Sequence, residues 1–153
     1  MECVADDVLT NVSIHVLENH AFLFPEREDV DPSRACATDL LQASVQFGGA
    51  ASGELILCVP IELANEIAAD ILGVDIGSED AAPLIRDAVG ELANVLCGNV
   101  LKATEFKAQV LDLAAPEVSA VNAEVWKNLS SKAQTIELSV DDHRLLVHFR
   151  IES

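Results

Sequence analysis

The sequence is poor in positively charged residues. It has 9 Lys and Arg against 26 Asp and Glu in 153 residues, which gives a formal net charge of −17. This charge repels the phosphate backbones of nucleic acids and anionic lipid surfaces, so binding to either is disfavoured. The compatible partners are metal ions and proteins with basic patches.

Residue patterns typical of metal sites and of common catalytic motifs are also missing. The cysteines are Cys3, Cys36, Cys58 and Cys97, and the histidines are His15, His20, His143 and His148. No two cysteines form a C-x-x-C pair. We therefore expect the cysteines to be reduced and to act as small buried hydrophobic residues, as is usual in a reducing compartment. Neither a G-x-S-x-G elbow nor a Gly-rich phosphate loop occurs. A serine–histidine–aspartate or a cysteine–histidine arrangement stays open, but no motif supports either.

The chain lacks a recognisable targeting or membrane-spanning segment. Met1 is followed by acidic residues, among them Glu2 and Asp6, and not by a basic segment and an apolar run. We therefore expect a cytoplasmic protein. Half of the residues are hydrophobic, which is enough for one domain with a real core over residues 1–153.

Hydrophobic periodicity predicts an α+β fold with an antiparallel sheet of about five or six strands and long helices packed on one face. The expected helices are Val4–His20, Ile61–Leu72 and Asp80–Ala103. The expected strands are Leu41–Phe47, Gly53–Val59, Phe106–Leu113, Thr135–Val140 and Arg144–Ile151. Residues 25–34 are predicted to form a loop. For Val118–Lys132 the pattern leaves a short strand and a loop open.

The pattern D-x-x-x-E-x-x-N, formed by Asp87, Glu91 and Asn94, is the most informative motif. Offsets of four and three place these side chains on one face of the predicted long helix, opposite its apolar face. The simplest alternative is that these three residues only form a solvent-exposed helix face without a specific function. Gly90 and Gly98 flank the polar residues. Each glycine in a helix interior destabilises the helix by about 1 kcal/mol relative to alanine, so we expect these glycines to be needed for close packing or for the access of a partner.

The tetrapeptide Glu91–Asn94 also occurs at Glu62–Asn65. There, no aspartate stands four residues before the glutamate, because position 58 is Cys58. Glu62 also lies in the first turn of its predicted helix, where a carboxylate interacts favourably with the helix dipole. We therefore predict one site and interpret the repeat as a coincidence.

With the motif on a long helix, with Gly98-Asn99 after it and with Pro116 about twenty residues later, the chain resembles the CheC/CheX/FliY family of chemotaxis phosphatases, and its CheX-like branch most. The segment 22–26 is also similar to CheX-like openings. CheC proteins carry a second E-x-x-N on the first helix, which this chain lacks, so the resemblance implies one site.

The resemblance implies a phosphatase that removes the aspartyl phosphate of a CheY-like response regulator. Asn94 would orient the attacking water, and Glu91 would pair with a lysine of the receiver. Asp87 would contact the rim of the partner or support the start of the helix, and Gly98 would leave room for the partner. Pro116 would be structural.

The resemblance further implies that Mg²⁺ is bound by the phosphorylated partner, and that the chain has no cofactor or metal site of its own. It also implies a possible homodimer formed through sheet edges, to which the terminal hairpin would contribute an exposed edge. A non-catalytic CheX-like module that docks on receivers or other signalling proteins through the same helix is the alternative.

Overall fold

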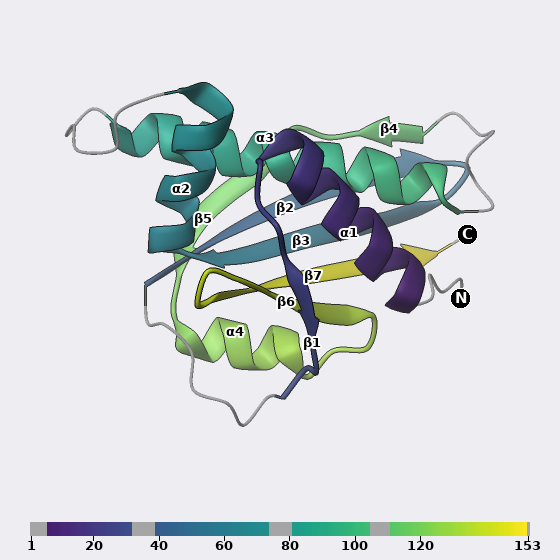
Figure 1. The fold of residues 1–153 in the computed structure, drawn as a ribbon. Helices are drawn as coiled ribbons and strands as arrows, with labels where there is room; N and C mark the ends of the chain where they lie inside the picture. Colours follow the sequence, from purple (N-terminus) through teal and green to yellow (C-terminus); the bar gives the residue numbers. More distant parts are fainter. Residues whose placement is uncertain (1–5, 32–38, 74–80, 105–110, 153) are drawn as a thin grey trace.

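The computed structural model describes residues 6–31, 39–73, 81–104 and 111–152, and these form one antiparallel sheet with helices on both faces (Figure 1). The helices are α1 (Asp6–His20), α2 (Ile61–Leu72), α3 (Ala81–Lys102) and α4 (Ala123–Ser130). The strands are β1 (Glu26–Glu28), β2 (Leu40–Gly49), β3 (Ser52–Pro60), β4 (Leu111–Leu113), β5 (Glu117–Val121), β6 (Thr135–Val140) and β7 (His143–Glu152). The α+β class and the antiparallel sheet are confirmed, and the sheet has seven strands instead of five or six.

The main core lies between the sheet and the three helices α1, α2 and α3. Alternate residues of the long strands point to this face, as the period of two in the sequence predicts. The helix at Ile61–Leu72 has the predicted bounds. It ends at Gly73, whose φ of 65° is left-handed and whose N–H donates to the carbonyl of Ala69 at 2.9 Å.

A fourth helix, α4, covers part of the opposite face, which the sequence did not predict. Asn122 caps its start, because the Asn122 side chain accepts hydrogen bonds from two backbone N–H groups of the first turn, and the helix buries Trp126 and Leu129. These side chains pack against Leu40, Ile56, Cys58 and Leu146 in a second, smaller core. The undecided segment Val118–Lys132 therefore forms both a strand and a helix.

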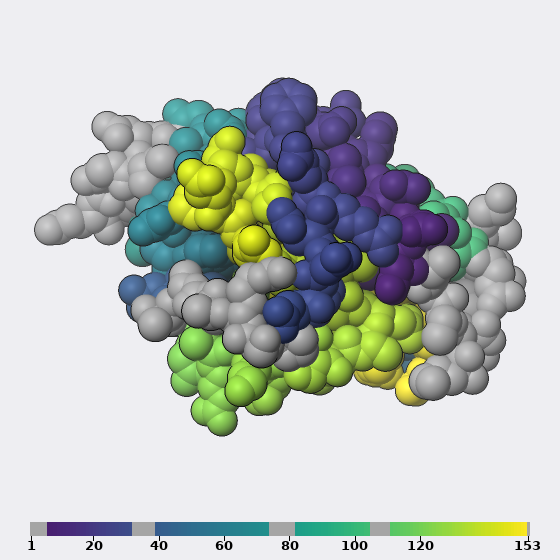
Figure 2. Space-filling view, turned by 60° about the horizontal axis from the view of Figure 1, so that its bottom comes forward, coloured from purple at the N-terminus to yellow at the C-terminus, as the bar shows by residue number. Residues whose placement is uncertain are grey.

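The strand order is β1-β6-β7-β3-β2-β4, and β5 also pairs with β2. The terminal hairpin therefore lies inside the sheet, and the expectation that it supplies an exposed edge is wrong. One side of β6 is paired by the short strand β1, which falls in the predicted loop 25–34. In Figure 2 the blue β1 segment lies at the surface between purple α1 and the yellow C-terminal residues, and its three residues pair with Glu137, Leu138 and Ser139 of β6.

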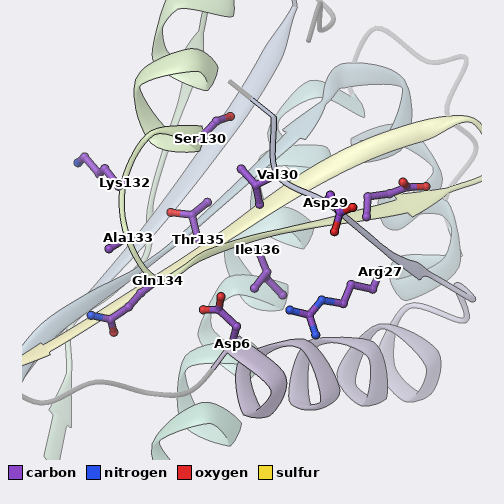
Figure 3. Close-up of a pocket in the computed structure, with 11 residues that line it drawn as sticks. Asp6, Arg27, Asp29, Val30, Ser130, Lys132, Ala133, Gln134, Thr135 and Ile136 are labelled. Atoms are coloured by element: carbon purple, nitrogen blue, oxygen red, sulfur yellow. The ribbon is translucent and has the colours of Figure 1, made fainter. Parts of the chain in front are cut away.

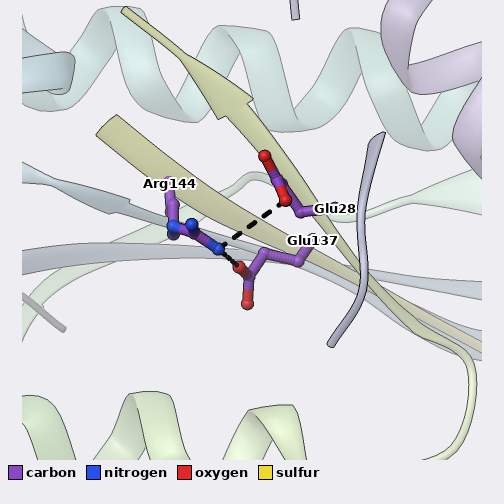
Figure 4. A network of polar contacts seen from close by, with 3 residues as sticks. All are labelled: Glu28, Glu137 and Arg144. Carbon is purple, nitrogen blue, oxygen red and sulfur yellow. Dashed lines mark hydrogen bonds and ion pairs between the residues drawn. The ribbon is translucent and has the colours of Figure 1, made fainter. Parts of the chain in front are cut away.

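A polar network ties β1, β6 and β7 together on the face that carries α4 (Figure 4). The Arg144 guanidinium donates to the Glu137 carboxylate at 2.7 Å, and Glu28 lies 3.9 Å from the same nitrogen. The Glu137 side chain is only 1% exposed. The guanidinium thus compensates a carboxylate that would otherwise be costly to bury.

Candidate functional site

The polar residues singled out in the sequence lie together on α3. Asp87 and Glu91 are exposed, whereas Asn94 and Gly98 are half-buried. The opposite side of the helix is anchored in the main core by residues with no more than 6% exposure: Ala88, Val89, Leu92, Ala93, Leu96, Cys97, Val100 and Leu101. The prediction of a polar face opposite an apolar one is confirmed, and the apolar face is wider than the sequence indicated.

Pro116 lies in a β-bulge at the edge of the sheet beside α3. The pairs Phe47–Leu113 and Ser44–Glu117 bracket a stretch in which Ala114, Ala115 and Pro116 face only Val45 and Gln46, so one residue is extra. Proline is tolerated there because a bulge at an edge strand requires no ladder N–H.

The bulge contacts α3 at Gly90, which is buried. A Cβ atom placed on Gly90 would lie 3.2 Å from both Pro116 Cγ and Val118 Cγ2, closer than ordinary carbon contacts of about 3.5–4.0 Å. Arg86, one turn earlier, donates a hydrogen bond to the Val118 carbonyl at 3.1 Å. Gly90 is therefore a packing glycine, which allows the edge of the sheet to approach the helix.

Gly98 has a different environment. A Cβ placed on Gly98 meets no atom within 4 Å outside its own helix and chain neighbours, so this glycine leaves open space at the end of the polar face. The neighbouring Asn99 is occupied, because its carboxamide donates to the Val95 carbonyl at 2.8 Å. Of the two reasons that the sequence left open, the structure shows packing at Gly90, and at Gly98 it shows open space.

A hollow of about 430 Å³ opens next to the polar face. It is lined by Arg86, Asp87, Gly90, Glu91, Pro116 and Val118. The structure thus brings Asp87 and Glu91 to a concave surface whose wall is Pro116, while Asn94 and Gly98 continue the same helix face beyond it. The sequence had no signal for Arg86, because its partner Val118 is 32 residues away.

A second hollow, of about 350 Å³, lies between the start of α1, β1 and the turn before β6 (Figure 3). Its side chains include acidic Asp6 and Asp29 and basic Arg27 and Lys132. Arg27 is already bound to Asp7 at 2.6 Å. With both charge signs mixed and this cation engaged, the hollow is a weaker candidate than the one beside α3.

The repeated tetrapeptide and the described cysteines do not belong to the polar face of α3. Glu62 of the repeated tetrapeptide approaches His143 at 3.9 Å, and therefore belongs to a contact between α2 and the terminal hairpin. Cys58 and Cys97 are buried, and burial raises the pKa of the Cys97 thiol to about 12. Cys3 and Cys36 fall outside the described residues. Where the structure describes the chain, no three His, Cys, Asp or Glu side chains gather as a metal site would require.

Residues 41–149 match the protein family described as chemotaxis phosphatase CheX. The match covers most of the chain and includes both α3 and the bulge with Pro116. The chain belongs to the CheX family. A comparison with curated proteins finds no match.

Solved structures of CheX and related proteins share the fold at low sequence identity. The CheX of Vibrio vulnificus has a TM-score of 0.71 at 16% identity, over 98% of this chain and 100% of that one. The CheX–CheY–BeF3–Mg²⁺ complex from Borrelia burgdorferi gives 0.69 at 17% identity, over 96% and 97%. FliY of Thermotoga maritima gives 0.57 at 14% identity, over 100% and 92%.

The described residues contain no helix with the length and apolar character that crossing a membrane requires.

Proposed function

We propose that this CheX-family chain hydrolyses the aspartyl phosphate of a CheY-like response regulator. The observation that carries the proposal is the accessible line of Asp87, Glu91 and Asn94 on α3, in a chain of a chemotaxis phosphatase family. A relative with the same fold was crystallised in a complex with CheY, BeF3 and Mg²⁺, which supports a receiver as the partner.

In this proposal the phosphoryl group and its Mg²⁺ belong to the receiver, and the chain supplies positioning. Asn94 enters the receiver site and orients a water in line with the bond that breaks. A carboxamide suits this role because it both accepts and donates hydrogen bonds without a proton transfer. In phosphoryl transfer such positioning supplies much of the rate acceleration.

Glu91 sets the docking in this mechanism by pairing with a lysine of the receiver. An ion pair that loses its water on docking contributes more to specificity and register than to affinity. Asp87 lines the same hollow as Glu91, one turn nearer the start of the helix, and contacts the rim of the receiver. The open space at Gly98 lets the partner approach beyond Asn94.

The test follows phosphate loss from a Mg²⁺-loaded, phosphorylated CheY-like receiver. Asn94→Ala should lower the rate by at least about 100-fold while the complex still forms. Glu91→Ala should weaken binding. Asn99→Ala is the matched control, because the Asn99 carboxamide is bound to the Val95 carbonyl and should not affect turnover.

The results separate a phosphatase from a docking module. Normal hydrolysis by Asn94→Ala would show that the carboxamide does not position the water. A wild-type chain that binds the receiver without accelerating hydrolysis would favour the non-catalytic docking function.

We also propose a homodimer formed through a sheet edge. Because the terminal hairpin is internal, the edge strands of the described sheet on the side of α3 are β4 and β5. Sedimentation equilibrium should then give twice the chain mass of 16.3 kDa. A mass of one chain at all concentrations would contradict the dimer.

A further inference from the structure

Leu84 extends the polar line on α3 by one turn. It lies three residues before Asp87, so the positions 84, 87, 91, 94 and 98 are separated alternately by three and four and share one helix face. We call these five residues the docking strip. The Leu84 side chain is 40% exposed, and the strip spans about 21 Å at 1.5 Å per residue.

A single exposed leucine is ordinary on a soluble protein. Leu84 differs in two respects. The buried side of α3 already anchors the helix through residues such as Val89 and Leu92, which are at most 1% exposed. Leu84 is also the only residue of the docking strip with a large apolar side chain, since the others are Asp87, Glu91, Asn94 and Gly98.

The rest of the strip gives little affinity by itself. Charged groups that lose water on docking mainly determine orientation and specificity, whereas burial of apolar surface supplies most of the free energy of association. A surface that must hold a receiver long enough for reaction therefore needs an apolar contact, and Leu84 provides one in line with the polar residues.

We propose that Leu84 is an apolar docking contact for the phosphorylated receiver. It binds an apolar patch about 15 Å from the phosphoryl group that Asn94 faces, the length of ten helical residues. This inference rests on the proposed function and adds to it the second chemical feature of the partner. Leu84 governs the affinity for the receiver and not the chemical step.

The experiment measures binding separately from turnover. A CheY-like receiver loaded with Mg²⁺ and beryllium fluoride is titrated with wild type, Leu84→Ala and Leu84→Met. Loss of the buried side chain should weaken binding about tenfold in Leu84→Ala, whereas methionine, which keeps the apolar surface, should bind within about twofold of wild type. With the phosphorylated receiver, Leu84→Ala should raise KM about tenfold and leave kcat unchanged.

Leu72 provides the matched control. It is 43% exposed at the end of α2 and lies outside the docking strip, so Leu72→Ala should bind like wild type. An equal loss of binding in Leu72→Ala, or a lower kcat with unchanged KM in Leu84→Ala, would overturn the inference.

The outcome for Leu84 is distinguishable from that for the phosphatase. If Leu84→Ala binds like wild type while Asn94→Ala has lost turnover, the docking role is wrong and the catalytic proposal stands. If wild type binds without hydrolysis and Leu84→Ala binds tenfold more weakly, the docking role stands and the catalytic proposal is wrong. A receiver that binds none of the variants nor the wild type overturns both.

Discussion

Replacing Gly90 with alanine should destabilise the protein, although alanine is the better helix former. The helical preference alone predicts a gain of about 1 kcal/mol. The new methyl group would lie 3.2 Å from carbons of Pro116 and Val118, so the edge of the sheet must shift. Overpacking of this kind costs about 1–3 kcal/mol.

The steric cost should exceed the helical gain because the edge is held from two sides. Val118 pairs with Ala43 of β2, and its carbonyl accepts the hydrogen bond from Arg86. We therefore expect a net loss of about 1 kcal/mol in the free energy of unfolding. For a chain of this size such a loss lowers Tm by about 3 °C.

Gly98→Ala is the matched variant for the measurement. No atom outside its own helix and chain neighbours lies within 4 Å of the added carbon, so the helical gain of about 1 kcal/mol should appear in full and raise Tm by about 3 °C. Both variants are compared with wild type by thermal and urea unfolding, followed by circular dichroism. If Gly90→Ala raised Tm as much as Gly98→Ala, the close approach between α3 and the bulge would carry no cost, and the argument would fail.

Three further predictions concern buried groups. Arg144→Ala should cost about 3 kcal/mol in urea unfolding, because buried Glu137 loses the guanidinium 2.7 Å away. Arg150 is the control, because its ion pairs are partly exposed, and Arg150→Ala should lower the free energy of unfolding by less than about 1 kcal/mol. Equal losses of stability in Arg144→Ala and Arg150→Ala would contradict the prediction. Burial lowers the pKa of His148 below 6.5, so the unfolded chain binds the proton more readily, and stability should fall as pH drops below 6.5. In His148→Gln the urea midpoint of unfolding should change less between pH 7 and 5.5 than in wild type. The same dependence of the midpoint on pH in both proteins would contradict this role of His148. The pKa of about 12 for Cys97 leaves little thiolate, so alkylation of Cys97 at pH 8 should require unfolding, and fast labelling of Cys97 itself in the native protein would contradict this prediction.

Local signals explain which helices were predictable. Ile61–Leu72 was predicted with its bounds because Pro60 precedes it and Gly73 adopts a left-handed conformation after it, and both effects act within a few residues. The helix α4 was not predicted, since its eight residues bury only two large apolar side chains, Trp126 and Leu129. Their partners come from distant strands.

The placement of strands could not be predicted in the same way. The turn at Asp141 and Asp142, both with positive φ, forms the terminal hairpin locally. Whether that hairpin lies at an edge depends on pairing with β1 and β3, which are more than 80 residues away in sequence. The expectation of an exposed edge at the hairpin was wrong for this reason.

The sequence by itself determined the line of Asp87, Glu91 and Asn94, because the geometry of an α-helix fixes which offsets share a face. It also determined the α+β class through the periods of its apolar residues. Only the tertiary structure decided that Gly90 contacts the bulge at Pro116 while Gly98 faces open space. These environments depend on contacts between segments far apart in the chain, and no local pattern encodes such contacts.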